Sequence, residues 1–226
     1  MAAKLTIITI DGPAGAGKST LARRLARKLG WIFLDTGALY RCVALVLRDR
    51  GRPEAAEDEA VRTAAGLDLD FRLEDGEQKL LLEGRFLGEE IRTPEISRLA
   101  SYFSAMPGVR LALLPLQRRL GEKGFLVTEG RDMGTVVFPE AGLKFFLMAA
   151  PEIRARRRFL ELQQKGLQAD YQKELADLKL RDSRDQNRST APLVWGADTE
   201  VIDSSCLELE DVLALMYQRA AAVFNL

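Results

Sequence analysis

The sequence contains no histidine among its 226 residues, so any mechanism must work without the commonest general base. It has only two cysteines, Cys42 and Cys206, whose separation suits neither a metal site nor a redox pair, and we expect free thiols. No apolar run is long enough to cross a bilayer, and the short run near the N-terminus lacks a secretory pattern. These absences favour a protein of the reducing cytoplasm.

The formal net charge is zero, because 33 lysines and arginines balance 33 aspartates and glutamates. No global field therefore attracts nucleic acid or a membrane surface, and basic residues do not alternate with aromatic ones. Neither Asn-Lys-x-Asp nor Thr-Lys-x-Asp occurs, which removes the base-reading motif that a GTPase requires.

The most specific feature that is present is a phosphate-binding loop of the form G-x-x-x-x-G-K-[ST]. It consists of Gly12, Pro13, Ala14, Gly15, Ala16, Gly17, Lys18 and Ser19. The apolar, β-branched run over 5–10 is typical of a buried strand, and leucines at four-residue spacing over 19–29 indicate an amphipathic helix. A strand, this loop and a helix in succession predict a binding site for a nucleoside triphosphate.

The residue types of the loop suit phosphate chemistry. Its glycines allow backbone conformations that aim successive N–H groups at phosphate oxygens, and the following helix adds its positive dipole end. We expect Lys18 to reach the β- and γ-phosphates and the Ser19 hydroxyl to help hold Mg²⁺. Thr20 is counted with the ATP-binding segment, although its position is that of a first-turn helix residue.

Strands and helices alternate along the rest of the chain, which predicts one α/β domain over 1–226. Besides 5–10, strands are expected at 31–34, 125–128, 143–148 and 200–203. Helices are expected at 37–50, 94–103, 108–120, 151–164, 171–184 and 208–224. Five such strands predict a doubly wound parallel sheet. The charged segment 52–92, with short alternating runs, is interpreted as a small antiparallel appendage.

Arginine gathers with carboxylates and hydroxyls in four places, which we expect in loops or at strand ends, where such sheets bind ligands. These places are 35–41, Ser101 with Arg110, 129–135 and 181–188. Most surface arginines are solvated or paired with neighbouring carboxylates, and for each single arginine of these four clusters this interpretation stays open. The run Gly130-Arg131-Asp132 follows a buried strand directly, which favours a ligand site there.

Taken together, these segments resemble the bacterial cytidylate kinase family. The resemblance is carried by residues 12–19, 34–41, 90–93, 130–139 and 181–193, so it covers essentially the whole chain. It implies an ATP- and Mg²⁺-dependent enzyme of pyrimidine metabolism that converts CMP or dCMP to the diphosphate, and a monomer. It also implies a P-loop kinase core with a monophosphate-binding part at about 36–105 and a lid at about 150–190.

The resemblance also gives roles to individual residues. Asp132 and Thr36 would accept hydrogen bonds from the cytosine amine, and Arg110, with Ser101 nearby, would donate to the acceptor edge of the base. Uracil carries a carbonyl in place of the amine, so a carboxylate there disfavours it. The ribose would meet Arg181 and Asp185, and the acceptor phosphate would be held by Arg41, Arg131 and Arg188.

No general base is needed in this scheme, because the attacking group is already a phosphate oxygen anion. Lys18, Arg131 and Arg188, with Mg²⁺, would supply alignment and charge neutralisation. The arginine-rich segments 154–165 and 181–188 would form the lid that excludes water. Consecutive helix positions face different directions, so only part of this run can reach ATP, and Arg157 is the residue assigned to it.

Two positions depart from the commonest family pattern. Glu129 stands where aspartate is usual, which puts a direct contact at that position in question, and Thr36 stands where some members have serine. Two alternatives remain open on the sequence alone: a P-loop kinase of another small metabolite, and a nucleic-acid binder that uses the arginine clusters. A screen of phosphate acceptors separates them.

Overall fold

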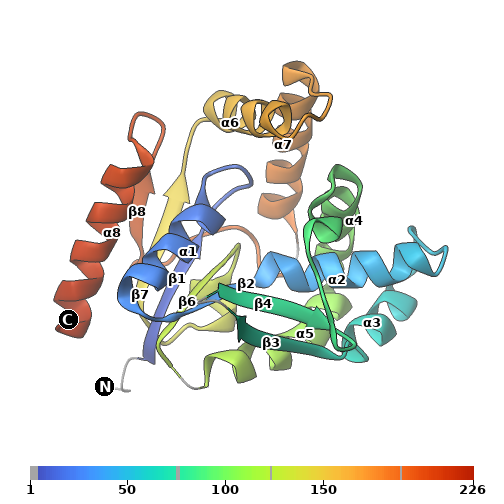
Figure 1. Ribbon diagram of the computed structural model, residues 1–226, viewed down its shortest axis with the longest axis horizontal. Helices are drawn as coiled ribbons and strands as arrows, with labels where there is room; N and C mark the ends of the chain where they lie inside the picture. Colours follow the sequence, from blue (N-terminus) through green and yellow to red (C-terminus); the bar gives the residue numbers. More distant parts are fainter. Residues whose placement is uncertain (1–4, 75–76, 123, 189) are drawn as a thin grey trace. The chain divides into compact units, whose positions relative to one another are not determined.

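The computed structural model describes residues 5–74, 77–122, 124–188 and 190–226 (Figure 1). The chain divides into two compact units. The first comprises the described residues of Met1–Leu34 and Lys123–Leu226, and the second those of Asp35–Glu122. Each unit encloses its own cluster of buried apolar side chains.

A five-stranded sheet with the order β2-β6-β1-β7-β8 forms the centre of the first unit. The strands are β1 (Leu5–Asp11), β2 (Ile32–Asp35), β6 (Leu126–Gly130), β7 (Ala141–Met148) and β8 (Glu200–Asp203). β1 runs parallel to β6 and β7, and β7 parallel to β8. β6 and β7 are buried almost throughout, which explains their apolar runs and confirms the predicted parallel sheet. The register brings the segments that follow β1 and β6 side by side.

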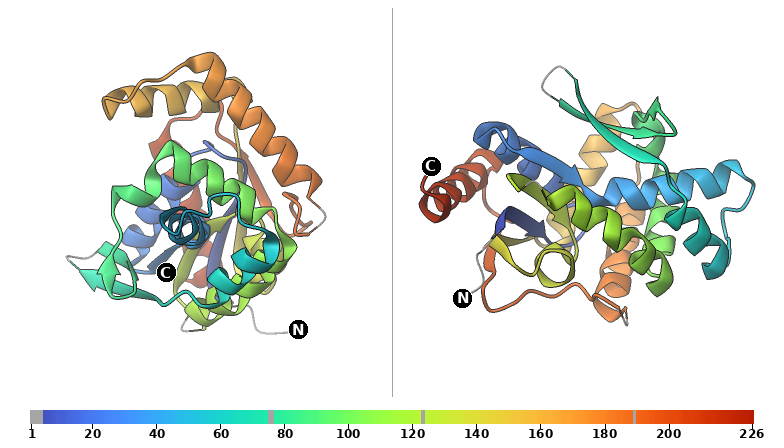
Figure 2. Two further views of the ribbon diagram at one scale, coloured as in Figure 1. Left: turned by 90° about the vertical axis from the view of Figure 1, so that its right-hand side faces the viewer. Right: turned by 90° about the horizontal axis from the view of Figure 1, so that it is seen from below.

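Four α-helices complete the described part of the first unit. They are α1 (Lys18–Leu29), α6 (Pro151–Gln164), α7 (Tyr171–Asn187) and α8 (Leu209–Phe224). α1 and α8 pack on the sheet, where Leu25 and Met216 share one core with Phe145 of β7. α6 and α7 meet at an angle (Figure 2, orange), and residues of both pack on Ala14 of the phosphate-binding loop.

The second unit consists of helices and a small sheet. Its helices are α2 (Thr36–Asp49), α3 (Glu57–Ala65), the 3₁₀ turn η1 (Glu89–Arg92), α4 (Pro94–Ser104) and α5 (Pro107–Gly121). The antiparallel strands β3 (Leu69–Glu74), β4 (Glu77–Leu82) and β5 (Arg85–Phe86) form the predicted appendage. In the part of the chain that the structure describes, no single helix is long and apolar enough to span a membrane. The bent pair α4 and α5, at 99°, passes that test by length and composition alone.

Two expectations about local structure were wrong. The segment 52–92 was read as strands and loops only, yet it contains α3, whose acidic first turn suits a helix N-terminus and whose Ala60 and Ala64 face the core. The helix predicted at 171–184 extends to Asn187, so most of the cluster 181–188 lies in α7 and not in a loop or at a strand end, because this polar stretch contains no glycine or proline to end the helix. Ser101 and Arg110 also lie outside loops, within α4 and α5, as the helices predicted at 94–103 and 108–120 require.

Candidate functional site

The phosphate-binding loop follows β1 directly, and its conformation requires glycine. Gly12 has φ 146°, and a Cβ there would lie 2.0 Å from the carbonyl oxygen of Leu147 in β7. Gly17 has φ 95° and caps α1 in the left-handed conformation. The first turn of α1 carries no acidic side chain, so the positive end of the helix remains available to an anion.

Lys18 is buried at the start of α1. Its Nζ donates a hydrogen bond to the carbonyl oxygen of Pro13 at 2.8 Å. Burial, followed by the positive charge of Arg131, lowers the pKa of Lys18 from 10.5 to about 7, while the carboxylates of Glu129, Asp185 and Asp11 act in the opposite direction. An anion bound beside Lys18 would therefore favour its charged form.

Ser19 and Glu129 form an oxygen pair next to Lys18. The Ser19 hydroxyl donates to Oε1 of Glu129 at 2.6 Å, and Glu129 is buried near the end of β6. Because the hydroxyl proton is directed at the carboxylate, the lone pairs of Oγ point elsewhere. Two hard oxygen donors of this kind suit Mg²⁺. Thr20, the next residue, is exposed in the first turn of α1.

Arg131 connects the end of β6 to α7. Its Nε donates to Oδ2 of Asp185 at 2.7 Å, and its Nη1 donates to the carbonyl oxygen of Gly130 at 3.2 Å. Burial would raise the pKa of Asp185, but the charge and hydrogen bond of Arg131 hold that pKa below its ordinary value. Burial also opposes the charge of Arg131, yet Asp185 outweighs it, so the pKa of Arg131 lies above its ordinary value.

Asp132 and Arg188 lie in the same neighbourhood and are both largely buried. Arg188 places Nη2 3.7 Å from Oδ1 of Asp132 and Nη1 3.9 Å from Oδ1 of Asp185, and its Nε donates to the carbonyl oxygen of Ala191. The positive charge of Arg181 also helps to lower the pKa of Asp185. We call this group of charged side chains the charge cluster; it consists of Lys18, Glu129, Arg131, Asp132, Asp185 and Arg188. The structure thus brings the predicted catalytic residues together.

A buried carboxylate that was not among the predicted site residues lies at the end of β1. Oδ1 of Asp11 accepts from the backbone N–H of Met133 and Oδ2 accepts from that of Gly134, both at 2.8 Å. These residues begin the π-helical turn η2 (Met133–Val137), which follows Asp132. Burial raises the pKa of Asp11 to about 6, although both backbone hydrogen bonds lower it. The available sequence signal was its position directly before Gly12.

The arginines of α6 point in different directions, as expected. Arg154 is buried and donates to the carbonyl oxygen of Ala14 at 2.9 Å and, through two nitrogens, to Asp182 at 2.6 and 3.1 Å. Arg157, which was assigned to ATP, donates to the carbonyl oxygen and hydroxyl of Ser204, just after β8. Arg154 therefore links α6, α7 and the phosphate-binding loop.

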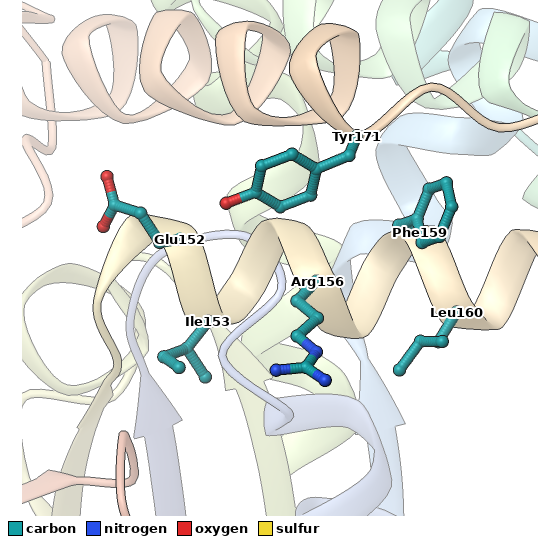
Figure 3. Close-up of a pocket in the computed structure, with 6 residues that line it drawn as sticks. All are labelled: Glu152, Ile153, Arg156, Phe159, Leu160 and Tyr171. Carbon is teal, nitrogen blue, oxygen red and sulfur yellow. The ribbon is translucent and has the colours of Figure 1, made fainter.

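A pocket of about 530 Å³ opens along α6 (Figure 3). Its lining residues are Glu152, Ile153, Arg156, Phe159, Leu160 and Tyr171. The Tyr171 ring, at the start of α7, points toward α6, whereas Arg156 projects from the side of α6 that faces away from α7. None of these residues belongs to the charge cluster, so the pocket is a separate feature of the predicted lid.

In the second unit, the predicted residues Thr36 and Arg41 lie at the start of α2. Asp35 caps this helix: its Oδ1 accepts from the N–H of Ala38 at 3.1 Å, and its Oδ2 accepts from Nη2 of Arg41 at 2.6 Å. Thr36, the first residue of the helix, is buried. Asp35 therefore fixes the direction of the Arg41 guanidinium.

The other two predicted residues of the second unit lie on α4 and α5. Arg110 is buried, its guanidinium lies 5.6 Å from the centre of the Tyr40 ring, and its Nη1 donates to the carbonyl oxygen of Ser104 at 3.2 Å. Ser101, one turn earlier in α4, accepts from the Ser104 hydroxyl through its own carbonyl oxygen. The unit therefore gathers Arg110 with the end of α4 and with α2.

Comparison with known proteins identifies the family of this chain. Residues 8–222 match the family model described as cytidylate kinase. The chain belongs to the cytidylate kinase family. Relatives named cytidylate kinase include those of Syntrophotalea carbinolica, 49% identical over 95% of this chain and 92% of the relative, and Salmonella arizonae, 48% identical over 97% of each. The resemblance inferred from the motifs is confirmed, and the protein is an enzyme, a kinase.

The solved structures support the fold of this cytidylate kinase family member. A crystal structure of an uncharacterized protein from Eubacterium ventriosum matches 96% of this chain and 98% of that chain, with a TM-score of 0.53 and 13% identity. At that identity the likeness concerns the fold alone. The doubly wound P-loop kinase core with its small antiparallel appendage agrees with the fold class predicted from the sequence.

Proposed function

We propose that this protein transfers the γ-phosphate of ATP to CMP or dCMP, which yields ADP and CDP or dCDP. One observation carries the proposal: two cations, the buried Lys18 of the phosphate-binding loop and the partly buried Arg131 beyond β6, are close enough for Arg131 to lower the pKa of Lys18. A phosphate group that passes from donor to acceptor would relieve that repulsion. Relatives named cytidylate kinase, 48–49% identical, support the choice of acceptor.

The proposed mechanism needs no general base. An oxygen of the acceptor phosphate is already an anion and attacks the γ-phosphorus in line. Lys18 neutralises charge on the transferred group, and Arg131 and Arg188 hold the acceptor phosphate. Closure of α6 and α7 would exclude water and so suppress hydrolysis of ATP. This chemistry agrees with a chain that has no histidine.

We propose that Ser19 and Glu129 hold the Mg²⁺ that accompanies ATP, since both offer hard oxygen atoms. When bound, the ion neutralises charge on the β- and γ-phosphate oxygens. The 2.6 Å hydrogen bond between the two side chains supports their joint role.

Replacing Glu129 with glutamine keeps the side-chain shape but removes its negative charge. The Mg²⁺ concentration for half-maximal activity should rise by about 10-fold or more, while the KM for CMP should change little. Initial rates measured against Mg²⁺ at fixed ATP test this. Glu210→Gln, at an exposed partner of Arg24, serves as the control, and an unchanged Mg²⁺ dependence in Glu129→Gln removes Glu129 from the metal site.

The remaining residue roles are proposed from the family resemblance. Asp132 and Thr36 accept from the cytosine amine, and Arg110 donates to the acceptor edge of the base, with Ser101 nearby. Arg181 and Asp185 meet the ribose, and Arg41 joins the arginines on the acceptor phosphate. We also propose that residues 36–105 and 150–190 serve as monophosphate-binding part and lid, that Arg157 contacts ATP, and that the protein is a monomer.

An acceptor screen tests the function directly. ATP consumption is measured with CMP, dCMP, UMP, AMP, GMP and no acceptor. We expect the largest kcat/KM with CMP or dCMP and very little turnover without an acceptor. Preference for AMP, or equal turnover in the absence of any nucleotide acceptor, would overturn the proposal.

The role of Asp132 in reading the base predicts a change in selectivity. Asp132→Ala should reduce the preference for CMP over UMP by on the order of 1–3 kcal/mol, because the cytosine amine loses its carboxylate acceptor. The measured quantity is the ratio of the two kcat/KM values. Asp211→Ala, on the exposed face of α8, should leave that ratio as in the wild type, and the same result for Asp132→Ala would exclude the assignment.

A further inference from the structure

The turn that follows Asp132 is capped from another strand. Within η2, the carbonyl oxygen of Asp132 accepts from the N–H groups of Val136 at 2.9 Å and Val137 at 3.2 Å. The N–H groups at the beginning of such a turn have no partner within it and need one elsewhere. Those of Met133 and Gly134 both donate to the carboxylate of Asp11, one to each oxygen.

Asp132 occupies the N-cap position of this turn but does not cap it. Aspartate at an N-cap ordinarily accepts from the second or third N–H of its own helix and does so from extended backbone. Asp132 instead has φ −146° and ψ 24°, and its side chain makes no cap hydrogen bond. Its carboxylate is directed to the charge cluster, where Oδ1 lies 3.7 Å from Arg188.

Side chains of β1 and β7 leave η2 little room to move. A Cβ at Gly134 would lie 2.8 Å from the hydroxyl oxygen of Thr9 in β1 and 3.2 Å from Cδ of Lys144 in β7. Asp11 itself is only 4% exposed, so water does not compete strongly for its two acceptor oxygens. The sheet therefore fixes the position of the turn, and Asp11 of β1 provides the acceptors for its first two N–H groups.

We propose that Asp11 is a positioning residue for base recognition. By accepting from Met133 and Gly134 it takes over the capping of η2, so the Asp132 carboxylate is held toward the acceptor base instead of its own turn. This inference rests on the proposed function, in which Asp132 reads the cytosine amine. In base recognition Asp11 acts through Asp132, whereas its charge favours the protonated form of Lys18 with every acceptor alike.

The central variant is Asp11→Asn. Its amide keeps one acceptor oxygen but presents an NH₂ group to the second backbone N–H, so one of the two caps is lost. Asp11→Glu is the second variant, which retains both acceptors and the charge but displaces them by one methylene. Asp203→Asn is the matched control, because Asp203 lies outside the proposed lid and also accepts two hydrogen bonds, from the backbone N–H and the hydroxyl of Ser205.

The readout is the ratio of kcat/KM for CMP to that for UMP, together with the KM for ATP. We expect Asp11→Asn to lower the ratio about 10-fold and to leave the KM for ATP within about 2-fold. Asp11→Glu should lower the ratio as well, and Asp203→Asn should not. In an Asp132→Ala background, Asp11→Asn should lower the ratio no further, since both changes act through the same carboxylate.

Two results would overturn the inference. One is an equal loss of rate with CMP and UMP in both Asp11 variants, the outcome of a purely structural role. The other is an additive effect of Asp11→Asn and Asp132→Ala on the ratio. Failure of the proposed function is distinguishable, because a wild-type enzyme without preference for CMP overturns both conclusions at once. A wild type that prefers CMP, with Asp132→Ala losing and Asp11→Asn keeping that preference, overturns the role of Asp11 alone.

Discussion

Replacing Lys18 with methionine is expected to abolish phosphoryl transfer and at the same time to stabilise the protein against heat in the absence of nucleotide. The rate should fall because a cation preorganised at the phosphate-binding loop is lost, and removal of one such group costs on the order of 10²–10³-fold in kcat. The stability should rise because burial and Arg131 make the charge of Lys18 unfavourable.

The pH dependence of this stabilisation has a defined sign. The pKa of Lys18 is about 7 in the folded protein and near 10.5 in the unfolded chain, so the unfolded chain binds the proton more tightly between these values. Lys18 therefore destabilises the fold most below pH 7, and this cost disappears as the pH rises toward 10.5. The gain in Tm from Lys18→Met should be several degrees at pH 6 and close to zero at pH 10, since about 1 kcal/mol corresponds to roughly 2–4 °C at this size.

Thermal melts at several pH values, with a coupled assay of CMP phosphorylation, check both parts of the prediction. Lys28→Met, on the exposed side of the same helix, is the control and should retain activity. Near-normal kcat in Lys18→Met contradicts its catalytic role. A gain in Tm that does not depend on pH contradicts the electrostatic account of its burial.

Replacing Arg131 with lysine is the second large effect that we expect. A guanidinium can bind the Asp185 carboxylate through Nε and present its remaining N–H groups to a phosphate, whereas an ammonium group cannot do both in one geometry. We expect kcat/KM for CMP to fall about 10²-fold, with a higher KM and a lower kcat. The same substitution at Arg219, whose paired nitrogens bind Glu200 on the surface, should have no effect on activity.

Arg131→Ala separates the role of this residue in stability from its role in binding. Without Arg131, Asp185 is left buried without its closest cation, which typically costs about 3–5 kcal/mol. In the wild type, the lowered pKa of Asp185 gives a stabilisation that is complete above pH 3.8 and is lost as the pH falls through the folded value. Chemical denaturation at pH 7 and at pH 3 should show a smaller acid-dependent loss in the variant, and an equal loss in both proteins contradicts this linkage.

Most of the fold could be predicted from the sequence because the strong signals agree with one another. The run before Gly12 and the run over 143–148 are apolar and β-branched or aromatic, and both form buried strands. The boundaries of α6 and β8 agree with the predicted ranges. α3 was not predicted because its apolar face consists of alanines, which contribute little to a hydrophobic pattern.

The residues that form the candidate site could be predicted better than the contacts between them. Motif spacing located Lys18 and Arg131, which the structure brings together. It could not show that Arg154 would pair with Asp182, because that contact depends on how α6 and α7 pack. The role of Asp11 was also hidden, since a π-helical turn leaves no periodic pattern in a five-residue stretch and its cap comes from 122 residues away.

The hydrogen bond between Arg131 and Asp185 has a consequence for discrimination among small anions. A free phosphate or sulfate ion that approaches Arg131 must compete with an internal carboxylate that is already well placed. In the function that we propose, the hydroxyl groups of a nucleotide would bind that carboxylate while its phosphate binds the guanidinium, so the nucleotide would replace the internal hydrogen bond that it breaks. Under the proposed function, the Arg131–Asp185 pair should therefore favour whole nucleotides over inorganic phosphate or sulfate.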